Sequence, residues 1–418
     1  MPYLLCIGFQ ARYVAILRKV IPDHMNLLIM EEPSLLPTAG ANSRIEFIHG
    51  KYQQTTVTED LLSLLSSYDI RGVVPLREYA VPVANQVACA LELPKIGNLA
   101  SICLRDKLTL RSTMQNQKLD VIRQPKFEKI SKLRELEDFF DRNGPTIIKP
   151  SNRQSTVGVF RIQNRNDIAE LYWKSVNAVE LGRTANDRPL VWTYQAEELV
   201  LGSEYSTEAF VQNGQVIFHN GTQKITSTGN CPFEIGHILP MSLLNQAVER
   251  LLNQATTELV EVLKIENGTL HAEWMITPDG EIYLIEAAGR APGCFITDLI
   301  ENSYKFSYFD AWQAVLTGRQ VKNFGVTPTQ ISAMRWLNPQ NGIVTAVDVS
   351  KLSSGANGIS ILSHNIAVKP GDQVSIVNNQ TRVGHIICMA SPSQFCLENL
   401  MSLADGIIHT EVQPQAIE

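Results

Sequence analysis

The 418-residue sequence has no closely spaced pair of cysteines, no excess of positive charge and no long apolar run. Its seven cysteines are far apart and odd in number, so neither a disulfide framework nor a structural zinc site is indicated. No apolar stretch approaches the roughly 18 residues of a membrane-spanning helix. Thirty-six Lys and Arg stand against 42 Asp and Glu, a formal charge of −6. Sequence-independent binding to nucleic acid is therefore not expected, and neither nucleic acid nor membrane is a predicted partner.

The first eight residues lack a basic segment ahead of their short apolar run, so no export signal is predicted. Together with the unpaired cysteines, this favours the reducing environment of the cytoplasm. The composition, 44% apolar and 19% charged, is that of a globular protein. At about 100 to 200 residues per domain, the length predicts two to four domains.

The first hundred residues alternate between strand-like and helix-like patterns, which is typical of a parallel sheet. The isolated Gly8 gives little support to a dinucleotide-binding fingerprint, which needs further glycines. Strands are predicted over residues 3–8, 26–30 and 72–75, and helices in the stretch up to residue 20 and over residues 60–65 and 81–91.

The pattern then changes along the chain. Mixed helices and short strands run from residue 107 to a polar, turn-rich segment at residues 182–189, which is a candidate linker. A helix is predicted over residues 246–263. After Gly318 the chain becomes rich in alternating strands, as in residues 331–336 and 373–377.

The most informative stretch is a predicted hairpin around the turn Thr277-Pro278-Asp279-Gly280. If Ile276 pairs with Glu281, then Glu273 lies opposite Leu284. Glu286 is then the diagonal neighbour of Glu273 on the same face, about 7 to 8 Å away at the backbone.

Two bare carboxylates on an otherwise apolar face repel each other, so a cation is expected between Glu273 and Glu286. Their hard oxygen ligands suit Mg²⁺, which completes its shell with water and substrate phosphates. Arg290 has the parity of Glu286 and would donate to a phosphate or oxyanion. Acidic residues on a solvent-facing hairpin are the alternative for an isolated hairpin of this kind.

Three further segments carry polar and charged groups. Lys149 ends an apolar strand and is followed by a polar loop with Ser155, Thr156 and Gly158, whose donors could cradle a phosphate, although the loop is not a Walker A motif. A surface lysine is the alternative for Lys149 alone. The other two segments are Arg105-Asp106-Lys107 before a helix and the acidic stretch from Tyr194 to Phe210.

Taken in order, these segments resemble the ATP-grasp superfamily over nearly the whole chain. The resemblance implies ATP and Mg²⁺ as cofactors, with Mn²⁺ as an alternative ion. It also implies roles for particular residues. Those implied to bind nucleotide are Lys107, Lys149, Ser155, Gly158, Glu197, Glu198, Val200 and Glu204; those implied to bind metal are Glu273 and Glu286; those implied to be catalytic are Lys149 and Arg290.

The resemblance further implies an α/β (α+β) ATP-grasp fold. Residues 1–103 would form an N-terminal parallel α/β domain that precedes the ATP-grasp domain, and residues 321–418 a C-terminal β-rich domain. Residues 104–188 would carry the phosphate loop, and residues 189–320 the adenine hinge and metal site. A homodimer is the assembly that the resemblance suggests.

Within the superfamily, residues 233–240 and the segment from Ala333 to Trp336 are most similar to ligases that join amino acids into dipeptides or related amides. The implied partners are therefore a small carboxylate and an amine, with amino acids as the expected class. His237 is a candidate for the substrate pocket, and a packed or surface histidine is the alternative. Arg335 is a candidate partner for a substrate carboxylate, with a structural ion pair as the alternative.

The chain departs from the family at Ala288, where the family usually has an asparagine that binds metal. Weakened or altered metal use is therefore an open alternative, and Arg153 could take over part of the anion binding of the glycine-poor loop. Two other functions remain: a biotin-carboxylase-like carboxylase and an inactive ATP-binding regulatory protein. The chain has no Met-Lys-Met biotinyl site.

Overall fold

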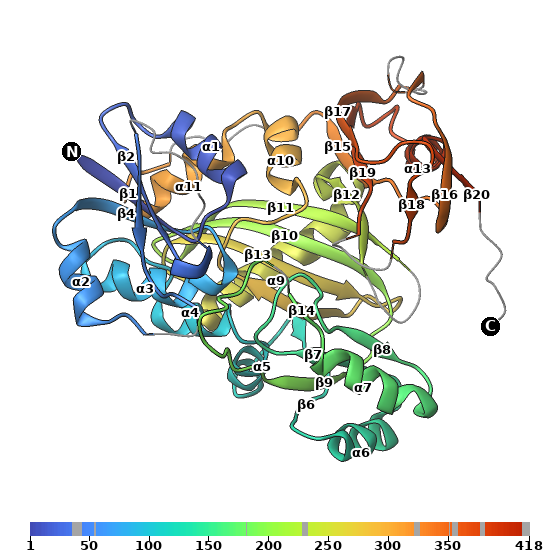
Figure 1. Ribbon diagram of the computed structural model, residues 1–418, viewed down its shortest axis with the longest axis horizontal. Helices are drawn as coiled ribbons and strands as arrows, with labels where there is room; N and C mark the ends of the chain where they lie inside the picture. The colour runs from blue at the N-terminus through green and yellow to red at the C-terminus, as the bar shows by residue number, and fades with distance from the viewer. Residues whose placement is uncertain are drawn as a thin grey trace.

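The computed structural model describes residues 1–35, 44–53, 56–180, 182–227, 233–321, 327–350, 352, 358–376 and 381–411. It confirms the predicted α/β (α+β) class, with a parallel N-terminal sheet and further sheets that are largely antiparallel. Figure 1 shows the N-terminal sheet at the left, a large central sheet, a small sheet with its helices below it, and the C-terminal strands at the upper right. No helix in the described ranges is long and apolar enough to cross a lipid bilayer.

The N-terminal sheet has the order β3-β2-β1-β4, and all three pairings are parallel, as predicted. Apolar side chains fill both of its faces, which explains why its strands read as nearly continuous apolar runs. The edge strand β3 was not predicted, although Ile45, Phe47 and Ile48 pack on the core. The elements are β1 (Pro2–Ile7), α1 (Ala11–Val20), β2 (Asn26–Glu31), β3 (Ile45–His49), α2 (Glu59–Leu65), β4 (Asp69–Pro75) and α3 (Val81–Ala90).

A small antiparallel sheet follows, with the order β6-β9-β7-β8 and two amphipathic helices packed on it. Its strands are β6 (Phe127–Ile130), β7 (Thr146–Pro150), β8 (Phe160–Ile162) and β9 (Tyr194–Glu198), and its helices are α6 (Leu133–Asn143) and α7 (Ile168–Val176). Before it come α4 (Asn98–Cys103), α5 (Lys107–Gln115) and the short strand β5 (Ile122–Arg123).

The central sheet has nine strands in the order β17-β19-β15-β12-β11-β10-β13-β14-β5, antiparallel except for the β14–β5 pair. Helix α9, which begins and ends at the predicted residues, buries one apolar side against it. The elements are β10 (Ser203–Gln212), β11 (Gln215–Thr226), β12 (Glu234–Leu239), α8 (Met241–Leu244), α9 (Gln246–Leu263), β13 (Gly268–Ile276), β14 (Ile282–Ala288), α10 (Ile296–Tyr304), α11 (Tyr308–Leu316), β15 (Ile331–Trp336), β17 (Ser360–Ile366) and β19 (Gly384–Ala390).

The described C-terminal residues also contain a small sheet and a helix: β16 (Gly342–Val347), β18 (Gln373–Val374), α13 (Leu397–Asp405) and β20 (Ile408–Glu411). The predicted strand over residues 373–377 was too long. Only Gln373 and Val374 pair, Ser375 and Ile376 leave the sheet, and Val377 lies outside the described residues.

The central sheet runs across two of the predicted domain boundaries. Strand β5 comes from residues 104–188 but pairs with β14, and β12 pairs with β15 across the boundary at residue 320. The four-part division therefore stays a prediction. What positions the site is the central sheet, with the small sheet and the loops of the N-terminal sheet facing it around one cavity.

Candidate active site

The cavity has a volume of about 1110 Å³ and is lined by residues from the central sheet, the small sheet, and α1 and the loops beside the N-terminal sheet. Ten of the thirteen predicted site residues line it. They are Lys107, Lys149, Ser155, Glu197, Glu198, Val200, Glu204, Glu273, Glu286 and Arg290.

The carboxylate pair sits on the predicted hairpin, but the predicted register was wrong. Ile276 pairs with Ile282 rather than Glu281, and Glu273 lies directly opposite Glu286. The reason is a β-bulge in β14, where the extra residue Ile285 has no partner on β13. The bulge returns Glu286 to the face of Glu273, as bulges beside functional sites commonly do.

The carbonyl oxygen of the bulged residue, Ile285, accepts hydrogen bonds from two cations. Arg111 Nη2 donates to it at 2.8 Å, and Lys149 Nζ lies 3.5 Å away. Both cations also contact the Glu197 carboxylate, Arg111 at 2.9 Å and Lys149 at 2.7 Å. The bulge thus connects the hairpin of β13 and β14 to the small sheet through Lys149.

Glu197 is 3% exposed and is held as a charged group. Burial alone would raise its pKa, but Arg111 and Lys149 outweigh that effect and lower the pKa to about 2. Burial lowers the pKa of Lys149 in turn, despite the attraction of Glu197. Arg111 was missed by the sequence analysis, because on α5 it reads as an ordinary solvent-facing residue of an amphipathic helix.

Lys107 begins helix α5, where the Asp106 side chain caps the helix by accepting from Thr109. Its ammonium lies 3.1 Å from Glu286. Burial acts to lower the pKa of Lys107, but Glu286 and Glu78 outweigh burial and raise it. Lys107 therefore carries a charge beside the carboxylate pair.

Arg290 follows β14 and reaches across to the N-terminal sheet. Its guanidinium donates to Glu78 at 2.8 Å, and Glu78 is buried in the turn after β4. Burial disfavours both charges, yet the pair keeps the pKa of Glu78 below its usual value and that of Arg290 above its usual value. Glu78 thus fixes the arginine where it lines the cavity.

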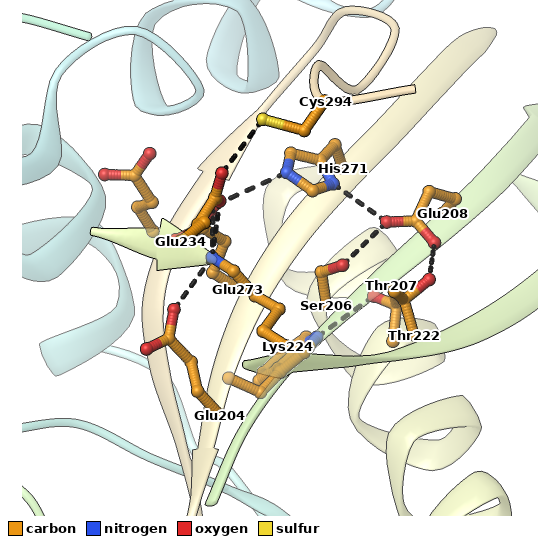
Figure 2. Close-up of polar contacts among 12 residues, drawn as sticks. Glu204, Ser206, Thr207, Glu208, Thr222, Lys224, Glu234, His271, Glu273 and Cys294 are labelled. Atoms are coloured by element: carbon orange, nitrogen blue, oxygen red, sulfur yellow. Dashed lines mark hydrogen bonds and ion pairs between the residues drawn. The ribbon is translucent and has the colours of Figure 1, made fainter. Parts of the chain in front are cut away.

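Lys224, on β11, is the most important residue that the sequence analysis missed. Its buried ammonium contacts three carboxylates, Glu204 at 2.7 Å, Glu273 at 2.9 Å and Glu234 at 3.1 Å (Figure 2). Burial opposes its charge, but Glu204 and the other carboxylates raise the pKa of Lys224 well above its ordinary value. No local sequence signal marks it, because only the pairing of β10, β11, β12 and β13 brings the four groups together.

A buried histidine stands behind Glu273. The Nε2 atom of His271 lies 3.5 Å from Glu273, and its Nδ1 atom lies 3.0 Å from the fully buried Glu208 (Figure 2). Glu208 also accepts from Ser206 at 2.8 Å and Thr222 at 2.7 Å. Burial would lower the pKa of His271, but Glu208 and Glu273 raise it to about 9. The imidazole is therefore a second cation against Glu273.

Three predicted residues do not line the cavity. Gly158 packs against α7, where its carbonyl accepts from Ser175 at 2.6 Å and an added Cβ would lie 2.9 Å from the Ser175 oxygen. Arg335 is 3% exposed and donates to the carbonyls of Ile235 and Trp336. His237 is fully buried beneath Glu234. These positions favour packing roles for Gly158 and Arg335.

Two positions that the sequence singled out have different outcomes. Arg153 lines the cavity, but its guanidinium stacks over Trp192 at 4.2 Å and donates to the Ala178 carbonyl. Ala288 lies opposite His271 in the hairpin and is 4% exposed, so it offers no side-chain oxygen to a metal.

The donor set nevertheless fits Mg²⁺. Glu273 and Glu286 present hard carboxylate oxygens from directly opposite positions of the hairpin, on the wall of an open cavity. Mg²⁺ needs few protein ligands, because it retains water and binds substrate phosphates. The chain therefore supplies two carboxylates to such an ion, and Ala288 adds no third ligand.

Replacing Lys224 by methionine tests the electrostatics of this cluster. We expect the free energy of unfolding to fall by about 1 to 3 kcal/mol, because three neighbouring carboxylates lose their shared cation. Excess Mg²⁺ should then raise the melting temperature of the variant more than that of the wild type, since the ion restores the missing positive charge. Thermal denaturation with and without Mg²⁺ measures both effects.

Lys174→Met is the matched control, because Lys174 forms an exposed pair with Glu170 on α7. Its melting temperature should stay close to that of the wild type. Equal Mg²⁺ shifts in the wild type and the Lys224 variant would refute the charge argument.

Comparison with known proteins agrees with this geometry. Residues 142–298 match the family described as ATP-grasp domain. The chain is 24% identical over 238 residues to dapdiamide A synthase from Enterobacter agglomerans. The aligned region covers 56% of this chain and about half, 54%, of that protein.

Solved structures resemble the whole chain. An L-amino acid ligase from Bacillus licheniformis superposes with a TM-score of 0.74 at 18% identity, covering 99% of each chain. An N5-carboxyaminoimidazole synthetase from Staphylococcus aureus, complexed with ADP, gives a TM-score of 0.65 at 15% identity, covering 96% of this chain and 97% of that one. Residues 142–298 of this chain therefore match an ATP-grasp domain, and the chain over its length has the fold of these solved structures.

Proposed function

We propose that the protein is an ATP-dependent, ADP-forming ligase that activates a carboxylate as an acyl phosphate and couples it to an amine. The observation that carries the proposal is the carboxylate pair Glu273 and Glu286, which meet across a β-bulge on the wall of a cavity also lined by Lys107, Lys149, Lys224 and Arg290. Phosphoryl transfer depends mostly on positioning and charge neutralisation, and this wall supplies both.

The nucleotide is proposed to lie between the two sheets. Lys107, at the start of α5, and Lys149, on β7 of the small sheet, line the cavity and would hold the phosphates, with the hydroxyl of Ser155 as a further donor. The segment with Glu198 and Val200 would contact the adenine. In the structure Glu197 is engaged by Arg111 and Lys149, so its proposed role is to fix the lysine rather than to bind ribose.

Mg²⁺ on Glu273 and Glu286 would supply charge neutralisation at the reacting phosphate. His271, backed by Glu208, would hold Glu273 in place, and Lys224 would neutralise charge on the transferred phosphoryl group. Arg290, fixed by Glu78, would stabilise the negative charge of the acyl phosphate until the amine attacks and phosphate leaves.

The substrates are proposed to be amino acids and the product a dipeptide or related amide. Similarity to an L-amino acid ligase and to dapdiamide A synthase supports this choice. Action in the cytoplasm and assembly as a homodimer are part of the same proposal. The first rests on the widely spaced cysteines and the expected lack of an export signal, and the second on the sequence resemblance.

The test is phosphate release from ATP and Mg²⁺ with the twenty amino acids, singly and in pairs, while product masses are recorded. We expect release that depends on particular amino acids, with ADP as the nucleotide product and a new mass equal to the sum of two substrates less water. AMP as the product, or ATP hydrolysis that ignores the second substrate, would refute the ligase.

Two rivals give different results in the same assay. A carboxylase resembling biotin carboxylase would incorporate labelled bicarbonate instead of forming an amide. An inactive regulatory protein would bind ATP without turnover on any mixture. Ala288 is the sequence feature that favours inactivity, and the complete set of cations around the carboxylate pair argues against it.

A further inference from the structure

A second cluster of ligating atoms lies beside the carboxylate pair. Glu234 and His237 come from β12, and Cys294 comes from the loop between β14 and α10. One carboxylate oxygen of Glu234 lies 3.0 Å from the Cys294 sulfur and 3.6 Å from His237 Nε2, and the three ligating atoms lie within 4.8 Å of one another. Figure 2 shows Cys294 directed at Glu234 above Lys224.

A second β-bulge brings the cluster together. In a regular strand, residues three apart point to opposite faces, so Glu234 and His237 should be separated. On β12, however, Gly236 pairs with Ile225 and Glu234 pairs with Thr226, which leaves Ile235 as an extra residue. The bulge turns Glu234 to the side of His237, just as the bulge at Ile285 turns Glu286 to the side of Glu273.

His237 is a buried polar side chain whose hydrogen-bonding capacity is not satisfied by the described residues. It is fully buried, and neither ring nitrogen has a hydrogen-bond partner among them. Leaving such a group unsatisfied costs about 1 to 3 kcal/mol. Its Nε2 atom faces the Glu234 carboxylate at 3.6 Å, so a metal ion between the two groups would satisfy the imidazole.

The ligand types and spacing suit a tetrahedral ion of the zinc class. Bonds of about 2.0 to 2.3 Å place tetrahedral ligand atoms roughly 3.3 to 3.8 Å apart. The oxygen–nitrogen separation of 3.6 Å already meets this, and the oxygen–sulfur separation of 3.0 Å needs a small opening. Glu234 and Cys294 also line the cavity, which leaves the fourth position open to water or a small molecule.

Charged groups of both signs surround the cluster. Three carboxylates, Glu204, Glu234 and Glu273, share the ammonium of Lys224. Arg382 lies 3.7 Å from Glu234 and 3.5 Å from the Cys294 sulfur, where its charge would stabilise a thiolate. Burial, followed by Glu234, raises the pKa of Cys294 to about 12, so a bound ion has to displace the thiol proton.

We propose that Glu234, His237 and Cys294 form a second metal site, for Zn²⁺ or a similar borderline ion, whose open position faces the cavity. Binding converts the Cys294 thiol into a metal-bound thiolate and releases one proton to solvent. The site is separate from the carboxylate pair Glu273 and Glu286, and it does not depend on the proposed ligase activity.

The test is a titration of the metal-free full-length protein with Co²⁺, which reports a thiolate ligand through a sulfur-to-cobalt charge-transfer band. We expect one equivalent of Co²⁺ to produce the band and Zn²⁺ to remove it. Cys294→Ser should abolish the band, and His237→Gln should weaken Co²⁺ binding by about tenfold or more. Absence of the band in the wild type would overturn the proposal.

Two control variants locate the ion. Cys89→Ser changes an exposed thiol away from the cluster and should keep the band. Glu273→Gln removes a ligand of the proposed Mg²⁺ site and should also keep it. A charge-transfer band that is lost in Cys89→Ser and retained in Cys294→Ser would refute the site.

A measurement on the wild type covers the case in which the cysteine variant does not fold. X-ray absorption of the zinc-loaded protein should show one sulfur at about 2.3 Å together with nitrogen and oxygen at about 2.0 to 2.2 Å. A shell of oxygen and nitrogen without sulfur would overturn the proposal.

Discussion

Replacing Glu273 by glutamine is expected to lower kcat for amino-acid-dependent ADP formation by about a thousandfold. Glu273 lies directly opposite Glu286, and an amide in its place removes half of the negative charge that would hold Mg²⁺. The replacement keeps the size of the side chain, and Lys224 retains Glu204 and Glu234 as partners, so the fold should persist. Steady-state kinetics over a range of Mg²⁺ concentrations measure the loss.

Glu281→Gln is the matched control for this prediction. Glu281 lies in the same hairpin, directly before β14. Its carboxylate is exposed and forms an ion pair with the exposed Arg123 at 3.2 Å. Its kcat should stay within about twofold of the wild type. If the Glu273 variant stayed within about tenfold of the wild type, the placement of the metal on this hairpin would be wrong.

Replacing Glu197 by alanine is expected to destabilise the protein by about 3 to 5 kcal/mol. The carboxylate is the shared partner of Arg111 and Lys149, which have side-chain exposures of 0% and 5%. Removing it leaves two buried cations without their counter-charge, which is far more costly than losing a surface ion pair. Urea unfolding followed by circular dichroism measures the change in the free energy of unfolding.

The control is Glu128→Ala, which removes the partner of Arg142 from an exposed ion pair on the outside of the small sheet. That change should cost less than about 1 kcal/mol. Similar losses for the two variants would mean that the Glu197 cluster contributes no more than a surface pair.

The same carboxylate predicts a pH dependence. Because the folded pKa of Glu197 is about 2, below its ordinary value of 4.5, its contribution to stability is complete above pH 4.5. It is lost as the pH falls from there through 2, because the unfolded chain takes up the proton first. The stability difference between wild type and Glu197→Ala should therefore shrink as the pH is lowered through this window.

Much of the fold could be predicted from local patterns. The apolar runs of β1, β2 and β4 and the periodicity of α9 are set by burial on the faces of the elements themselves, so they can be read without knowing their neighbours. The hairpin between β13 and β14 was predicted from its turn, and the Thr277 carbonyl accepts from Gly280 there. The edge strand β3 was missed, because its apolar run of Ile45, Phe47 and Ile48 is short and interrupted by Glu46.

The register of the hairpin and the contacts of its side chains could not be predicted from local sequence patterns. Whether Glu286 lies opposite or diagonal to Glu273 depends on the bulge at Ile285, whose carbonyl is held by Arg111 and Lys149 from other elements. A one-residue change in register moves every side chain to the other face, so a turn sequence alone cannot fix it.

The sequence by itself determined the order of the elements and the segments that carry charge, including Lys107, Lys149, Glu273, Glu286 and Arg290. These depend on residue type and spacing, which are properties of short stretches of chain. Only the tertiary structure decided which charges meet, because that depends on contacts between residues far apart in sequence. Strand pairing in the central sheet placed Lys224 among three carboxylates, and packing of the N-terminal sheet set Glu78 against Arg290.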